Sequence, residues 1–201
     1  MRRFTLHDPI SMAVYIAMIV SWLMFFFGFR WLQFRRPKAR EKRRDRVSVI
    51  GIVLQGAGYA SVWIIERPLF APIVSMPTWA ELVLAIVTVT IAAGSTWLVF
   101  SAVRTLGAQW AYIARVTEGH RLITEGPYRW LRNPIYMGML GMMLATGLAV
   151  SNWIAFPISI FLFGVGTYIR VSREEKILHS EFGEQWDDYK RRVPAVIPSL
   201  F

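Results

Sequence analysis

Apolar residues along the chain are gathered into five long blocks that are separated by shorter polar segments. The blocks cover residues 10–33, 47–65, 79–103, 135–150 and 153–171. Most of them approach the length of about 20 apolar residues that a helix needs to cross a bilayer. The pattern therefore predicts an all-α integral membrane protein with five transmembrane helices.

The last two blocks form one apolar stretch, from Ile135 to about Val171, that is too long for a single crossing. Ser151 and Asn152 interrupt this stretch, and the following Trp153 is of a residue type that favours membrane interfaces. We therefore predict two helices that are joined in a tight hairpin at this point.

The first block follows Arg2 and Arg3, an arrangement that also occurs in secretory signal peptides. The block is too long for the hydrophobic region of such a peptide, and no small-residue cleavage site is evident. We expect a retained transmembrane helix here.

Residues 173–193 have a different pattern, because apolar side chains recur at steps of four, four, three and four among charged ones. Such spacing places the apolar side chains in one stripe on a helix. We predict that the last span continues into a C-terminal amphipathic helix in the cytosol, with a bend at Gly183. The stripe consists of Leu178, Phe182, Trp186, Tyr189 and Val193.

Basic residues are distributed unevenly between the segments that connect the blocks. Residues 35–46 contain eight Lys or Arg and residues 104–134 contain five Arg, whereas residues 66–78 contain one. The positive-inside rule therefore places 35–46, 104–134 and the C-terminal tail in the cytosol and the N-terminus outside. In a bacterium, the chain would lie in the inner membrane in this orientation.

Composition agrees with a membrane protein, because 55% of the residues are hydrophobic, compared with about 45–50% in soluble domains. The net charge of +10 arises from basic residues beside apolar blocks, so we expect the lipid bilayer as a partner and no nucleic acid. The chain has no cysteine and three dispersed histidines. These features exclude disulfides and a cysteine nucleophile, and we expect no metal site.

The residues that are candidates for a functional site all lie within residues 104–201. We therefore divide the chain into a three-helix transmembrane region, residues 1–103, and a second part, residues 104–201. Within the second part, Arg170 and Glu174 lie four residues apart near the end of the last span and share a helix face. A charge at this depth is costly unless it is paired or faces a cavity. Arg170 therefore either snorkels to the headgroups while it pairs with Glu174, or belongs to a functional site.

Two stretches, GHRLITEGPYRWLRNPIYMG and IRVSREEKILHSEFGEQWDDYKRRVPAVIP, resemble the isoprenylcysteine carboxyl methyltransferase family. These are membrane-embedded enzymes that use S-adenosyl-L-methionine (SAM) and are related to phospholipid N-methyltransferases. The resemblance covers about residues 115–198. It includes a His before an apolar pair, G-x-Y, R-x-P-x-Y, an Arg shortly before two Glu, and F-G-x-x-W-x-x-Y, in the order of the family pattern.

The resemblance implies a SAM site built from the first stretch and from the exit of the last span. Arg170 falls on the arginine that meets the substrate carboxylate in the family, so Arg170 and Glu174 are the implied catalytic pair. The residues implied to bind SAM are His120, Arg121, Leu122, Ile123, Tyr128, Asn133, Pro134, Ile135, Tyr136 and Glu174.

The chain departs from the family pattern at Asn133, where the family usually has histidine. An asparagine side chain can donate and accept hydrogen bonds but cannot carry a proton near neutral pH. If the family histidine only holds SAM, Asn133 can take its place. If the family histidine acts as a base, that function is absent from this chain.

The residue types themselves also suit SAM. The faces of Tyr128 and Tyr136 can hold a cation or stack on adenine, and Glu174 can meet the amine or the ribose hydroxyls; each aromatic taken singly could instead be an interfacial anchor. A carboxylate acceptor is already ionised at neutral pH and needs no general base. An amine acceptor must lose a proton, for which only Glu175 or His120 are evident.

We therefore expect carboxyl O-methylation of a lipophilic acceptor, prenylated or lipid-like. Phospholipid N-methylation and small-thiol S-methylation on the same scaffold are the alternatives among methyltransferases. A non-catalytic membrane module that binds anionic lipid or a partner through its basic face is the alternative from another class. A sterol-type reductase that binds NADPH is a remote further one.

Overall fold

A computed structural model describes residues 9–28, 41–44, 46–64, 77–109, 115–117 and 121–196. His120, most of the basic segment 35–46 and most of the segment 66–78 lie outside these residues. All structural statements below concern the described part of the chain.

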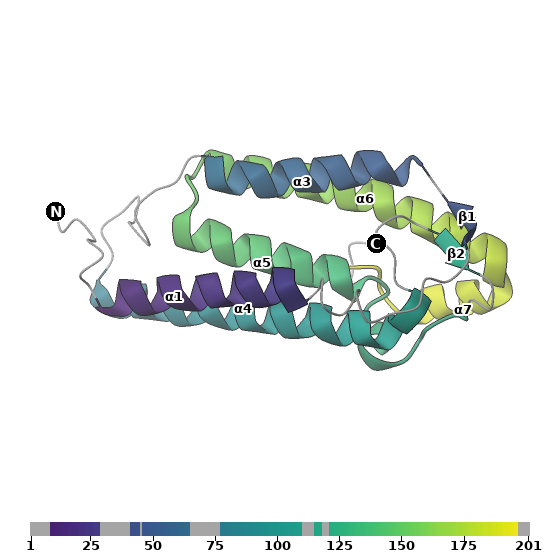
Figure 1. The fold of residues 1–201 in the computed structure, drawn as a ribbon, viewed down its shortest axis with the longest axis horizontal. Helices are drawn as coiled ribbons and strands as arrows, with labels where there is room; N and C mark the ends of the chain where they lie inside the picture. Colours follow the sequence, from purple (N-terminus) through teal and green to yellow (C-terminus); the bar gives the residue numbers. More distant parts are fainter. Residues whose placement is uncertain are drawn as a thin grey trace.

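Long helices dominate the fold and run side by side along its length (Figure 1). Their bounds agree with the five predicted blocks to within a few residues, except that residues 29–33 lie outside the described part and that the last helix ends at Phe182, eleven residues after the predicted end of its block. The prediction of a helical protein is confirmed. The helices are α1 (Pro9–Leu23), which continues as the π-helical segment η1 (Met24–Gly28), α3 (Ser48–Ile64), α4 (Thr78–Leu106), α5 (Pro134–Val150) and α6 (Ala155–Phe182).

Short elements gather at one end of the bundle. Two strands, β1 (Glu41–Arg44) and β2 (Arg115–Thr117), pair there in an antiparallel ladder. The sequence did not predict them, because strands of four and three residues give no periodic signal. The remaining short elements are the 3₁₀ helices η2 (Gly107–Gln109) and η3 (Gly126–Arg129) and the helix α7 (Glu184–Arg192).

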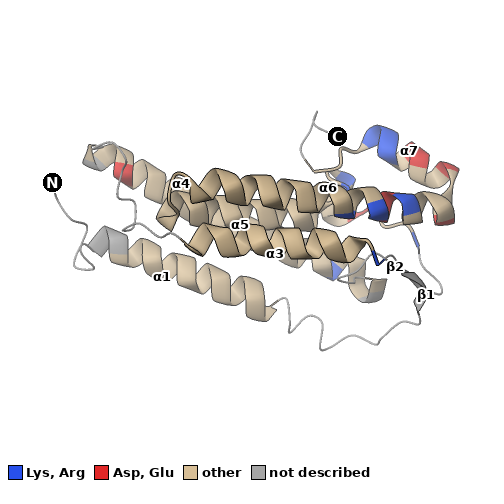
Figure 2. Ribbon diagram, turned by 90° about the horizontal axis from the view of Figure 1, so that it is seen from above, with Lys and Arg blue, Asp and Glu red and all other residues tan. Residues whose placement is uncertain are grey.

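Charged residues are concentrated at the same end, over the last part of α6 and over α7 (Figure 2). The central length of the bundle carries almost none, and α4 has Glu81 in its first turn. Two helices, α4 and α6, are long and apolar enough to cross a membrane. With 17 residues each, α3 and α5 are about 26 Å long, somewhat less than the roughly 30 Å hydrocarbon layer.

Two apolar clusters fill the bundle, in which α3 pairs with α6 on one side and α1 and α4 lie on the other (Figure 1). α5 contributes to both clusters. The first joins α1, α4 and α5 around Met18, Ala92 and Met142, and the second joins α3, α5 and α6 around Val62 and Phe163. α5 therefore links the two sides of the bundle.

Glycines let α3 and α6 approach at backbone distance. A Cβ atom added at Gly58 would lie 2.9 Å from the carbonyl oxygen of Ser159, and one added at Gly166 would lie 2.7 Å from that of Gly51. Small residues at such a contact allow helices to pack closely. This contact fixes the position of α3 along the axis of α6.

The C-terminal helices form a hairpin around Gly183, whose φ of 52° is in the left-handed region that glycine tolerates. α6 extends to Phe182, well beyond the predicted span, and α7 follows the turn. The predicted bend is therefore confirmed. The residues of the predicted stripe do pack together and against Leu122, but they come from two helices on either side of Gly183 and not from one. They are Leu178, Phe182, Trp186, Tyr189 and Val193.

We expect the variant Gly58→Ala to destabilise the protein by about 1–3 kcal/mol, because the added methyl group overlaps the backbone of α6. Gly56→Ala, in the same helix, is the control, because a Cβ atom there would meet nothing within 4 Å. That variant should be neutral or stabilising by about 0.5–1 kcal/mol. Thermal unfolding in detergent micelles measures both, and equal stabilities would contradict the close packing of α3 on α6.

Candidate functional site

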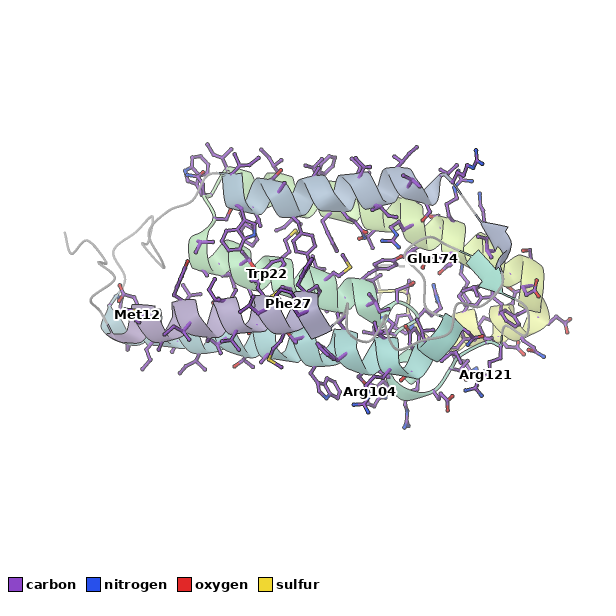
Figure 3. All side chains as sticks on the ribbon, in the orientation of Figure 1. Met12, Trp22, Phe27, Arg104, Arg121 and Glu174 are labelled. Atoms are coloured by element: carbon purple, nitrogen blue, oxygen red, sulfur yellow. The ribbon has the colours of Figure 1, made fainter. Side chains whose placement is uncertain are left out.

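A polar cluster lies where α3, α5 and α6 meet near the charged end of the bundle. The hydroxyl of Tyr136, at the start of α5, donates a hydrogen bond to the carboxylate of Glu174 on α6. Nη2 of Arg170 lies 3.6 Å from Oε1 of Glu174, and the Arg170 guanidinium lies 4.8 Å from the centre of the Tyr136 ring. Figure 3 shows Glu174 directed into the bundle, whereas Arg104 and Arg121 point outward.

Local sequence explains how these groups come together. Pro134 is the first residue of α5, a position that suits the fixed φ of proline. Helix α5 therefore begins two residues before Tyr136, whose side chain is buried against α6. On α6, the spacing of four residues brings Arg170 and Glu174 onto one face.

Arg170 is buried in the bundle with 7% of its surface exposed. The expected pair with Glu174 is present, but the guanidinium faces α3 and α5 and does not snorkel outward. Its Nη1 donates to Oε1 of Gln55 on α3 at 2.9 Å, and Nε2 of Gln55 donates to the Thr167 hydroxyl at 2.9 Å. A buried charge requires such partners.

Sequence reasoning missed Gln55, although a signal was present. Gln55 is the only side-chain amide in the apolar block 47–65. A strongly polar side chain within a membrane-length segment usually faces the interior and has a partner. The sequence gives no indication of which partner that is.

Tyr128 lies beside this cluster, buried against Ala102 and Ile123. Burial is the largest cause that raises the pKa of its hydroxyl, and the nearby charge of Glu174 adds to the effect. The hydroxyl therefore stays protonated and can act as a donor. The Tyr189 hydroxyl, whose pKa burial also raises, donates to the backbone carbonyl of Tyr128 at 2.6 Å and connects α7 to η3.

Arg132 forms a second polar centre that the sequence did not identify. It is buried with 8% exposure, and its Nη2 lies 2.8 Å from Oε1 of Glu175. Its Nη1 donates to the backbone carbonyls of Lys190, at 3.0 Å, and Val193. Lys190 reaches the other oxygen of Glu175 at 2.6 Å. Arg132 thus connects the segment before α5 to α6 and α7.

The remaining predicted residues occupy several environments. Asn133 holds the C-terminal segment, since its backbone and side-chain amides donate to the carbonyl of Ala195 at 2.9 and 3.1 Å. Arg121 is exposed and pairs with Glu125 at 2.9 Å. The others are apolar contacts: Leu122 lies against the α7 stripe, Ile123 and Ile135 lie beside Tyr128, and Pro134 is buried at the start of α5.

The structure thus brings Tyr128, Tyr136, Arg170 and Glu174 together around one carboxylate. Carboxylate oxygens and aromatic faces are the groups that bind organic cations, so Glu174 and the two tyrosines fit the cationic parts of SAM, whereas Arg170 suits an anionic group. In the described part of the chain, no three His, Asp or Glu side chains lie close enough to share a metal ion.

A mainly apolar cavity of about 470 Å³ lies between α5, α6 and the C-terminal segment. Its volume is in the range of small-molecule sites. Thr167, which accepts the hydrogen bond from Gln55, is part of its wall. Other lining residues include Leu140, Phe163 and Val171 on the apolar side and Arg132, Glu175 and Lys190 at the polar end.

The phospholipid methyltransferase family matches residues 83–185, slightly more than half of the chain. This segment contains Tyr128, Tyr136, Arg170 and Glu174, and the chain belongs to that family. Together with α4 and α6, which are long and apolar enough to cross a bilayer, the assignment indicates a membrane protein.

Several relatives are isoprenylcysteine methyltransferases, as the motifs led us to expect. Protein-S-isoprenylcysteine O-methyltransferase B of Arabidopsis thaliana is 33% identical over 104 residues, which are 49% of this chain and 51% of the plant protein. The enzymes named protein-S-isoprenylcysteine O-methyltransferase of Saccharomyces cerevisiae and Homo sapiens are each 30% identical, over 49% and 42% of this chain. The alignments span 42% of the yeast protein and 30% of the human one, so the chain matches at most about half of these relatives.

We expect Arg132→Met to lower the free energy of unfolding by roughly 3 kcal/mol or more, because it leaves Glu175 without its buried partner. Hydrogen exchange in residues 184–196 should also rise, since Arg132 holds two carbonyls of that segment. Arg129→Met is the control, because Arg129 is exposed beside Trp130 and its loss should cost at most about 0.5 kcal/mol. Unchanged exchange in the Arg132 variant would show that the segment is held by other contacts.

Proposed function

We propose that the protein is a SAM-dependent methyltransferase that methylates the carboxylate of a lipophilic acceptor, most like an isoprenylcysteine. The observation that carries the proposal is the Tyr136–Glu174–Arg170 cluster. It lies within the segment that matches the methyltransferase family and is connected through Gln55 to the wall of an apolar cavity.

The proposed cofactor site uses the carboxylate of Glu174 and the faces of Tyr128 and Tyr136 to hold cationic groups. When bound, SAM supplies an electrophilic methyl group on a sulfonium centre. Asn133 donates a hydrogen bond to the carbonyl of Ala195. Its proposed contribution to cofactor binding is to hold the C-terminal segment in place beside the site. Arg121, Leu122, Ile123, Pro134 and Ile135 stay in the proposed site as its rim and floor, and His120 lies outside the described residues.

Arg170 is the proposed ligand of the acceptor carboxylate. A guanidinium has five N–H donors in a planar fork, so it can hold Gln55 and a carboxylate at the same time. Removing water from the carboxylate and aligning it is what this reaction requires, because the carboxylate is already ionised. The burial of Arg170 provides such a water-poor environment.

The apolar cavity is the proposed place of the acceptor's prenyl or acyl chain. Its walls come mostly from α6, with Leu140 from α5, and Arg132, Glu175 and Lys190 mark its polar end. An amphiphile that enters from the bilayer would place its chain between the helices and its head toward the charged end of the bundle. This arrangement suits a prenylated or lipid-like acceptor.

Phospholipid N-methylation is the second candidate, since the family is named for phospholipid methyltransferases. An amine acceptor must lose a proton to a base. Of the two candidates, His120 lies outside the described residues, and Glu175 is already bound to Arg132 and Lys190, which favours a carboxylate acceptor. The names of the relatives also favour it.

We further propose five membrane spans with the N-terminus outside and the 35–46 segment, the 104–134 segment and the tail in the cytosol. The pairing of β1 with β2 supports this orientation, because it brings parts of the two basic segments to one end of the bundle. The gathering of charges at that end supports it as well (Figure 2). Residues 104–201 would then form the methyltransferase core on the cytosolic side.

Glu174→Gln and Arg170→Lys should each lower methyl transfer by roughly 100-fold or more, because each removes a charge or a planar fork that a ligand would meet. The measurement is transfer of a labelled methyl group from SAM to a prenylcysteine analogue, to phosphatidylethanolamine and to a small thiol. Glu184→Gln, which changes an exposed carboxylate in α7, is the control. If only phosphatidylethanolamine were labelled, the proposed carboxylate acceptor would be wrong. If both site variants kept wild-type turnover, Glu174 and Arg170 would not belong to the active site.

The absence of cysteine allows the proposed orientation to be tested with single cysteines. Thr124→Cys and Gln185→Cys, at exposed positions, should react with a membrane-impermeant maleimide from the cytosolic side only. Asn152→Cys, in the hairpin turn, should react from the opposite side only. If all three react from the same side, the five-span topology is wrong.

A further inference from the structure

We infer that Gln55 of α3 is a positioning residue for Arg170, which orients that guanidinium for an acceptor carboxylate. The inference rests on the proposed function of Arg170. Gln55 lies outside the segment that matches the methyltransferase family, so the inference extends the site to the N-terminal helices.

The orientation of the Gln55 amide is set by its two partners. A guanidinium can only donate hydrogen bonds, so Gln55 must present its oxygen to Arg170, at 2.9 Å. Its nitrogen then faces the hydroxyl of Thr167, also at 2.9 Å. Gln55 is buried with 2% exposure, so water does not compete for either bond.

The packing of α3 on α6 places Gln55 at the level of Arg170 along the helix axis. Gly51, one turn before Gln55, lies against Gly166, one turn before Arg170. A Cβ atom at Gly166 would lie 2.7 Å from the carbonyl oxygen of Gly51 and 2.9 Å from the backbone nitrogen of Gln55. A side chain at either glycine would therefore separate the helices and withdraw the amide from the guanidinium.

The neutrality of the amide is the important property. Glu174 already places one negative charge beside Arg170, since its Oε1 lies 3.6 Å from Nη2 of the guanidinium. Gln55 holds its other side without adding a negative charge. An acidic residue in place of Gln55 would add a second negative charge beside Arg170 and repel an incoming carboxylate.

The hydrogen bond to Thr167 connects Gln55 to the proposed site of the acceptor chain. Thr167 forms part of the wall of the apolar cavity and holds the far side of the amide. The same hydrogen-bonded row therefore runs from the wall of the cavity to the group proposed to bind the acceptor head. Gln55 fixes the position of that head group relative to the chain.

The test compares binding of a farnesylcysteine analogue with a free carboxylate to binding of its carboxamide, in full-length protein saturated with S-adenosylhomocysteine. We expect Gln55→Leu to weaken binding of the carboxylate by about 10- to 100-fold, the range for a hydrogen bond to a charged group. Binding of the carboxamide and of S-adenosylhomocysteine should each change less than about 3-fold, within the variation of a single context-dependent contact. Gln55→Glu should also weaken binding of the carboxylate, although it keeps an acceptor beside Arg170.

Ser61→Ala is the matched control in α3, because the Ser61 hydroxyl bonds to the carbonyl of Ala57 in its own helix. It should leave all three affinities unchanged. In the background of Arg170→Met, Gln55→Leu should have no further effect on carboxylate binding, because Gln55 acts through Arg170.

The inference is overturned if Gln55→Leu keeps the preference for the carboxylate, or if the effect persists in the Arg170→Met background. It is also overturned if Gln55→Leu weakens S-adenosylhomocysteine and both acceptor analogues alike, since that would show a structural role only. A wild-type protein that binds S-adenosylhomocysteine but neither analogue would instead overturn the proposed acceptor, and this inference with it. The wild-type measurement therefore separates the two failures.

Discussion

The buried charge of Arg170 is the constraint on which the arrangement of α3, α5 and α6 depends. Removing a guanidinium from water costs several kcal/mol unless other groups replace the lost hydration. Those groups come from three helices: Gln55 from α3, Tyr136 from α5 and Glu174 from α6 itself. Each helix must therefore be in register with the others for the charge to be tolerated.

Arg132 has the corresponding function for the C-terminal part of the chain. Its contacts to Glu175, Lys190 and Val193 join the exit of α6 to α7, and Asn133 beside it holds Ala195. Both residues directly precede α5. The start of α5 is therefore fixed by polar contacts to the C-terminal segment, and Tyr136 is held in place within its first turn.

Local patterns in the sequence predicted local features of the structure well. The five apolar blocks gave the helices, the spacing in residues 173–193 gave the stripe around α7, and the interval from Arg170 to Glu174 gave their pair. The partners that complete the site could not be predicted in this way. Gln55 and Arg170 are 115 residues apart, and Arg132 and Glu175 are 43 apart, so no periodicity relates them.

The separation between polar and apolar surfaces explains why a soluble donor and a lipophilic acceptor could meet here. Charged residues gather at one end of the bundle, whereas its central length is apolar (Figure 2). The cavity between α5 and α6 crosses that boundary, with Phe163 on its apolar side and Lys190 at its polar end. An amphiphile has the same division between chain and head, so hydrophobic burial of the chain would by itself bring the head to the depth of Arg170. The binding energy of the chain would then contribute to the alignment of the reacting groups.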